Sequence, residues 1–153
     1  DRIGKLRLPT DQQDALIRAA AKDYRRLKRD ARPGLDRLHV EDLHDLRKRA
    51  IHHRHQTAFL ATIAPEKHKA RLERRVERAK TLHEAIGVHR DLELLAAYLR
   101  PSREAGLHGE RQRLLEEIDR QQQAALKQAM QIVERLTRAK AKRYVRGLSP
   151  ASR

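Results

Sequence analysis

The 153-residue chain has no cysteine and no tryptophan, and only one phenylalanine, three tyrosines and six glycines. The absence of cysteine excludes disulfides, thiolate metal sites and a cysteine nucleophile. The few glycines form neither a phosphate-binding loop nor a Gly-x-Ser-x-Gly elbow. No apolar run is long enough to span a membrane, and the first residues lack the apolar core of a signal peptide. We therefore expect a soluble, cytoplasmic protein.

Positive charge is what the chain has in excess. It carries 36 lysines and arginines against 21 aspartates and glutamates, which gives a formal net charge of +15. Such an excess raises the local concentration of anions and speeds their association. Aromatic residues make up only 3% of the chain, which disfavours base stacking on a nucleic acid. The composition thus predicts a polyanion partner, and contact with a nucleic-acid or ribosome backbone stays an alternative.

Apolar residues recur at helical spacing, and no segment alternates as a strand does. The pattern predicts an all-α fold, an antiparallel bundle of about four long helices in one domain over residues 1–153. We expect the first helix to start with a cap from Thr10 or Asp11, the third to break at Gly87, and Leu95 and Leu114 to face the core. A basic tail over residues 139–153 is expected to fray at Ser149 and Pro150. The expected helices cover residues 10–31, 40–60, 65–99 and a stretch from after Pro101 to about 138.

One face of the first expected helix carries only cations. These are Arg18, Lys22, Arg25, Arg29 and Arg32, at spacings of four, three, four and three residues. Such spacing keeps all five side chains on one side of the helix, where like charges repel. A solvated face usually mixes the two signs, so this stripe indicates a surface against which an anion lies.

The second expected helix has a comparable face. His44, Arg47, Lys48, Arg54 and His55 stand at relative positions zero, three, four, ten and eleven, which share one broad helical face. Guanidinium groups are planar forks that suit two phosphate oxygens at once, and lysine adds a point charge. A phosphate beside His44 would favour its protonated form. This face therefore predicts a binding site for a ligand that carries a charge at every unit.

The nine histidines and the carboxylates do not predict a catalytic centre. His52, His53 and His55 are close in sequence, but neighbours on a helix project about 100° apart and cannot all reach one ion. No cluster of acidic residues has the spacing that metal-assisted phosphate chemistry needs. We therefore expect binding without catalysis, no metal site and no cofactor.

Two segments resemble the CHAD family, the conserved-histidine α-helical domain. Residues 43–49 (LHDLRKR), followed by Arg54, resemble the signature helix of that family. Residues 82–92 (LHEAIGVHRDL) resemble its Leu-x-x-x-Leu-Gly-x-x-x-Asp-Leu segment. Basic residues at 24–26 and 138–148 also stand where the family carries them. The order and spacing of the two main segments make the combination more specific than either alone.

The resemblance implies a helical-bundle protein that binds inorganic polyphosphate through a basic surface without hydrolysing it. An association with polyphosphate granules stays open. The family's histidine is His44, its following basic residues are Arg47, Lys48 and Arg54, and its acidic residue is Asp91. Asp91 either orients an arginine of the second helix or is an ordinary carboxylate near a helix start, favoured by the helix dipole. Together with the stripe and the tail, the predicted polyphosphate-binding set is Arg18, Lys22, Arg25, Arg26, Arg29, His44, Arg47, Lys48, Arg54, His55, Arg138, Lys142 and Arg143.

The chain departs from the family pattern in two residues and in length. A basic residue is usual where Ile51 stands, and an aromatic residue is usual where His55 stands. The family has two related bundles that face each other across a basic groove, whereas this chain carries one motif, and Lys48 makes it resemble the second copy. Either the chain is a fragment, or one half suffices, or two chains pair about a two-fold axis to rebuild the groove.

Overall fold

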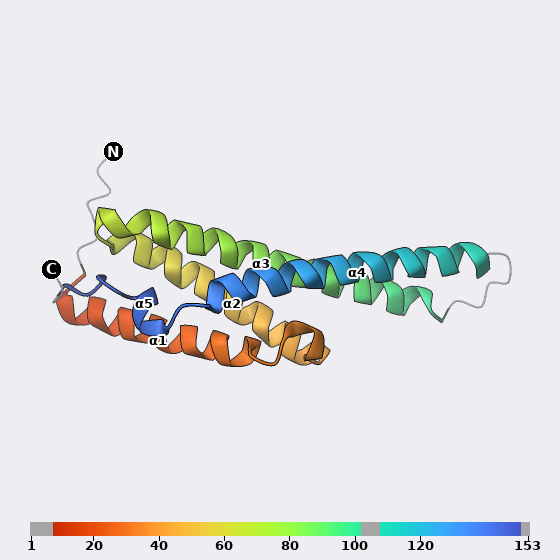
Figure 1. The fold of residues 1–153 in the computed structure, drawn as a ribbon, viewed down its shortest axis with the longest axis horizontal. Helices are drawn as coiled ribbons and strands as arrows, with labels where there is room; N and C mark the ends of the chain where they lie inside the picture. Colours follow the sequence, from red (N-terminus) through yellow and green to blue (C-terminus); the bar gives the residue numbers. More distant parts are fainter. Residues whose placement is uncertain (1–7, 102–107, 151–153) are drawn as a thin grey trace.

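The computed structural model describes residues 8–101 and 108–150, and these residues are helical with no strand among them. Four long helices confirm the predicted all-α bundle, in which α1, α2 and α3 lie side by side and α4 returns along α3 (Figure 1). The elements are α1 (Thr10–Ala31), the 3₁₀ turn η1 (Leu35–Arg37), α2 (Val40–Ile63), α3 (Glu66–Leu99), α4 (His108–Thr137) and the short α5 (Ala141–Tyr144).

The helix boundaries follow the proline and glycine signals, with one error at the start. Gly34 has a φ of 89°, a left-handed conformation that suits glycine and turns the chain from α1 into η1. The predicted cap by Thr10 or Asp11 is wrong, since Pro9 occupies the N-cap position and no side chain caps the helix. Instead the Gln13 side-chain amide donates to the carbonyl of Leu8 at 2.6 Å, which ties the incoming chain to the first turn.

Helix α3 is uninterrupted over its 34 residues, so the predicted break at Gly87 is wrong. At a rise of 1.5 Å per residue it is about 51 Å long. A glycine inside a helix costs only about 1 kcal/mol relative to alanine, and α3 packs against both α2 and α4. Helix α3 therefore links the compact part of the molecule, where it packs with α1 and α2, to the part that it forms with α4 alone.

The last turns of α3 and the first half of α4 extend beyond the ends of α1 and α2 as a two-helix arm (Figure 1). Only one seam can be buried between two helices, and Ala96, Ile118 and Ala125 fill it. The prediction that Leu95 and Leu114 face the core is wrong, because they are 42% and 45% exposed. Their apolar spacing fits a bundle side that α1 and α2 do not reach.

A half-buried arginine lies at the centre of the compact part of the fold. The guanidinium carbon of Arg75 is 4.9 Å from the ring centroid of Tyr24 and 4.7 Å from that of Tyr144. Its NH1 donates to the carbonyl of Leu136 at 2.8 Å and lies 3.4 Å from Nε2 of His53. Burial, and then the charge of Arg75, lowers the pKa of His53 to about 3, so its ring stays neutral and can accept from the guanidinium. The cluster joins α1, α2, α3, α5 and the end of α4.

The C-terminal strap, residues 139–150, packs against this cluster. Tyr144 and Leu148 are buried, and the Tyr144 hydroxyl lies 2.7 Å from Thr57 Oγ1. The guanidinium of Arg71 donates to three strap carbonyls, those of residues 143, 144 and 146, at 2.9, 2.9 and 3.1 Å. Ser149 donates to Asp14 at 2.7 Å, so the expected fraying at Ser149 is wrong. A chain end that buries apolar side chains and pairs its carbonyls is held in place.

Replacing Arg75 with leucine should lower the free energy of unfolding by about 3 kcal/mol. The loss combines two desolvated cation–π contacts with a charge-assisted hydrogen bond. Urea unfolding followed by circular dichroism measures it. Arg74→Leu is the matched control, since Arg74 is exposed one residue earlier in the same helix and should change stability by less than about 0.5 kcal/mol. Equal effects of the two substitutions would contradict the central role of Arg75.

Candidate functional site

Helix α2 is continuous from Val40 to Ile63, so its predicted cationic face exists as one side of one helix. Lys48 and His55 point into solvent and are exposed. His44, Arg47 and Arg54 are half-buried because they lean toward α3. The opposite side of α2 carries Leu46, Ala50, His53 and Thr57, all buried. The packing of α2 thus decides which side chains of this face are open to solvent and which lie against α3.

Helix α3 supplies a hydrogen-bond partner for each of these three half-buried side chains. Arg47 Nε donates to the carbonyl of His83 at 3.2 Å, and Arg54 NH1 lies 3.2 Å from Nε2 of the same residue. The guanidinium of Arg90 contacts Nδ1 of His44. We call the seven residues His44, Arg47, Lys48, Arg54, His55, His83 and Arg90 the α2–α3 site.

Gly87 makes room for one of these arginines. A Cβ built at Gly87 would lie 3.3 Å from Arg47 Nε, closer than an ordinary van der Waals contact. The glycine therefore lets the guanidinium of Arg47 lie against the backbone of α3 on its way to the His83 carbonyl. This contact gives a physical reason for a glycine at the centre of a long helix.

Both histidines of the site that contact arginines are held neutral near pH 7. Partial burial, then the charges of Arg90 and Lys48, lowers the pKa of His44. Burial, then the charges of Arg54 and Arg47, lowers the pKa of His83. A neutral imidazole nitrogen accepts a hydrogen bond from a guanidinium, which orients the arginine and leaves its other N–H groups for an outside acceptor.

A cavity of about 420 Å³ opens at the end of the site where α2 begins. Its lining is mixed, because Glu41, Asp45 and Glu93 join His44 and Arg90. Asp45 is 4.0 Å from Lys48 Nζ, an exposed pair that water and salt screen. The strongest unbalanced positive charge therefore lies further along α2, toward Arg54 and His55.

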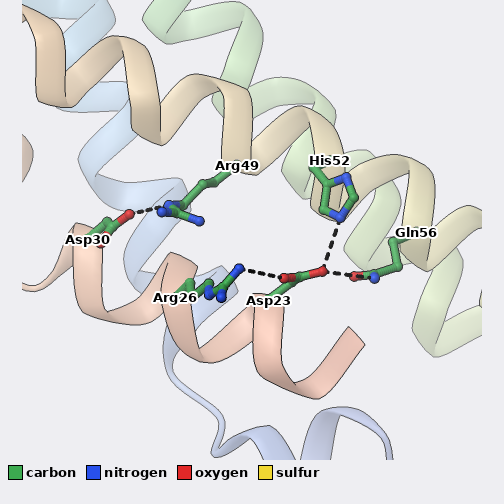
Figure 2. A network of polar contacts seen from close by, with 6 residues as sticks. All are labelled: Asp23, Arg26, Asp30, Arg49, His52 and Gln56. Carbon is green, nitrogen blue, oxygen red and sulfur yellow. Dashed lines mark hydrogen bonds and ion pairs between the residues drawn. The ribbon is translucent and has the colours of Figure 1, made fainter. Parts of the chain in front are cut away.

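The predicted cations of α1 lie on a different side of the molecule. Helix α1 faces α2 with Asp23 and Asp30, which contact His52, Gln56 and Arg49 of α2 (Figure 2). At 100° per residue, the stripe from Arg18 to Arg29 is centred about 120° around α1 from these carboxylates. Arg18, Lys22, Arg25 and Arg29 are exposed there, while Arg26 sits beside Asp23 at 3.6 Å. Acidic pairing with α2 thus turns the basic stripe away from His44.

The remaining predicted residues also lie outside the α2–α3 site. Lys142 and Arg143 are exposed on the strap, next to α1, and Arg138 is 3.6 Å from Glu134 at the end of α4. Asp91 is exposed and pairs with no arginine of α2 among the residues that the structure describes. The predicted set therefore forms two separate surfaces, the α2–α3 site and a face of α1 with the strap.

Neither a metal-binding cluster nor a membrane-spanning helix is found among the residues that the structure describes. Within residues 8–101 and 108–150, no three histidine or acidic side chains converge in a way that could hold a metal ion. Across the same ranges, each helix is too short or too polar to cross a membrane.

Comparison with known proteins settles the family. The model described as CHAD domain matches residues 3–100, more than half of the chain. The chain belongs to the CHAD family. The CHAD match spans α1, α2 and α3 with both motif segments, whereas α4 and the strap lie outside it. Neither the curated proteins nor the solved structures gave a match.

Two site residues lie within the second CHAD segment, at positions that its pattern leaves open, and were not among the predicted binding residues. His83 and Arg90 stand seven residues apart in α3, with Gly87 between them at a spacing of four and three. That spacing places all three on one face of a helix, so their shared face could have been predicted from the sequence. Their partners on α2 could not be read from the sequence, because the register between two helices depends on side-chain packing.

Gly87→Ala should displace the Arg47 guanidinium from the His83 carbonyl while leaving α3 intact or slightly more stable. Alanine favours a helix by about 1 kcal/mol over glycine, so a lost contact is separable from a lost helix. The Nε–H resonance of Arg47 in a ¹⁵N spectrum reports the displacement, and thermal unfolding reports stability. Gly109→Ala in α4 is the control, because nothing lies within 4 Å of its added carbon. An unshifted Arg47 resonance would contradict the close packing.

Proposed function

We propose that the chain binds inorganic polyphosphate through the α2–α3 site and does not cleave it. The observation that carries the proposal is that His44, Arg47 and Arg54 are aligned on α2 and each contacts a partner on α3. Side chains that are already oriented lose less conformational entropy when they bind a ligand. Membership of the CHAD family, which is associated with polyphosphate-related proteins, supports the same ligand.

The length of the site supports a chain of phosphates over a single phosphate. His44 and Arg54 are ten residues apart, which is about 15 Å along the axis of α2. Lys48 and His55 add exposed donors between and beyond them. A row of that length matches a ligand that repeats a negative charge along its backbone, since each unit finds its own donor.

Nucleic acid is the competing ligand, and the test has to separate the two. A base-reading protein stacks bases on exposed aromatic side chains. One such side chain, Phe59, is 40% exposed one turn beyond His55. Competition of long-chain polyphosphate against duplex DNA and RNA at near-physiological salt measures which ligand binds more tightly. Tighter binding of nucleic acid would contradict the polyphosphate proposal. Release of orthophosphate from polyphosphate on incubation would contradict binding without cleavage.

Arg54→Gln should weaken polyphosphate binding about tenfold, and it should flatten the dependence of log affinity on log salt concentration by about 0.7. One lost phosphate contact releases one counterion fewer, and the slope for a single-stranded polyanion is about 0.7 per contact. Isothermal titration at several salt concentrations measures both quantities. Arg113→Gln removes the same charge from an exposed position of α4 and serves as the control. An unchanged slope for Arg54→Gln would remove Arg54 from the ligand contact.

Polyphosphate affinity should rise as pH falls through the histidine range. In the free chain, partial burial and Arg90 keep the pKa of His44 below its usual 6.5, whereas a phosphate contact favours the charged ring. Affinity should therefore increase between the pKa of the bound state and that of the free state, and level off below the latter. Titrations in buffers of different ionisation enthalpy measure the proton taken up. His44→Gln should flatten the profile, and a wild-type profile without slope would exclude His44.

A further inference from the structure

The strap lies along α1 over most of the length of that helix. The Lys28 ammonium donates to the carbonyl of Ala139 at 2.9 Å near one end of α1, and Asp14 accepts from Ser149 near the other. Between these two ties, Tyr24 and Tyr144 lie with their ring centroids 5.1 Å apart. The strap therefore runs antiparallel to α1, on the side of α1 that borders the basic stripe.

The joint surface of α1 and the strap is strongly cationic. Residues 135–153 include no aspartate or glutamate. On α1, Asp23 contacts α2, and Asp30 contacts both α2 and Arg29, whose Nε donates to it at 3.0 Å. Asp14 is held by Ser149, and Asp11 stands at the far end of the stripe. We call this surface the α1–strap face, and its exposed cations are Arg18, Lys22, Arg25, Arg29, Lys140, Lys142, Arg143 and Arg146.

The backbone of the strap does not balance these charges. Carbonyl oxygens at the end of a short helix carry partial negative charge, which would otherwise attract neighbouring cations. Here Arg71 occupies the carbonyls of residues 143, 144 and 146, and Lys28 occupies that of residue 139. Apart from Arg29, which is paired with Asp30, no ion pair with a carboxylate is recorded for the exposed cations of this face among the residues that the structure describes.

A row of carboxylates separates this face from the α2–α3 site. Asp23 and Asp30 lie between α1 and α2, where His52, Gln56 and Arg49 contact them (Figure 2). A polyanion that extends directly from one cationic surface to the other would have to pass these carboxylates and cross the width of the α1–α2 pair. The two surfaces are thus distinct sites on one chain.

We propose that the α1–strap face is a second polyphosphate-binding surface, so that one chain bridges two polyphosphate segments. The inference rests on the proposed function of the α2–α3 site. A protein with two such surfaces cross-links its ligand, since each bound segment raises the effective concentration of protein for the next. The four strap cations double the charge that α1 alone offers, and the fold supplies this pairing.

A sandwich-capture experiment tests the bridge. Polyphosphate is attached sparsely to a surface, the protein is bound and washed, and fluorescent polyphosphate is then added. The wild-type chain should retain the fluorescent strand. Arg18→Gln combined with Lys22→Gln and Arg25→Gln should still bind the attached polyphosphate through the α2–α3 site but retain at least fivefold less fluorescent strand. Removal of the same number of charges from α4, by Arg113→Gln, Lys127→Gln and Arg135→Gln, should leave capture unchanged.

The outcomes separate the two proposals. No binding of the wild-type chain to attached polyphosphate would refute the proposed function itself. Binding without capture, or full capture by the α1 triple variant, would overturn the second surface while leaving the first. Light scattering on the same samples gives the mass, and a dimer that captures through two α2–α3 sites is recognised because the α1 variant then captures normally. Equal capture of fluorescent duplex DNA would overturn the assignment of polyphosphate to this face.

Discussion

The packing of the Arg75 guanidinium between Tyr24 and Tyr144 is the contact on which the rest of the fold depends. Tyr24 comes from α1 and Tyr144 from α5, and the carbonyl of Leu136 brings in the end of α4. Removing part of a guanidinium from water is costly unless it finds partners, and the rings, the carbonyl and the neutral His53 supply them together. Because these partners converge only in one arrangement, the cluster fixes how α1 and the strap sit on the other helices.

Two sides of helix α3 make different contacts, one with the strap and the tyrosines and the other with α2. Arg71 and Arg75 hold the strap and the tyrosines, while His83, Gly87 and Arg90 receive the cations of α2. Both sides use arginine, whose planar fork satisfies several acceptors at once and stays charged at all relevant pH values. The absence of a break at Gly87 matters here, since a kink would change the register between the strap side and the site side.

Much of the fold was readable from the sequence, because long helices with strong 3.6-residue periodicity need few assumptions. The α2 face could be predicted for the same reason, since all its members stand on one helix. The grouping of the α1 stripe and the tail with His44 could not be predicted, because it depends on which side of α1 meets α2. Asp23 and Asp30 decide that orientation through partners 19 to 33 residues away. Likewise, the exposure of Leu95 follows from how far α2 reaches along α3, which periodicity does not encode.

Two cationic surfaces on a chain of net charge +15 have an energetic consequence for folding. Like charges held together on α1 and the strap repel in the folded state and separate in the unfolded one, so they reduce stability. Contacts such as Arg75 with its tyrosines offset that repulsion, and screening by salt weakens it. A polyanion bound to the native chain adds stability in proportion to RT ln(1 + [L]/Kd) for each surface that it occupies. The same side chains that weaken the free protein are therefore the ones through which a ligand would stabilise it, which couples folding to binding.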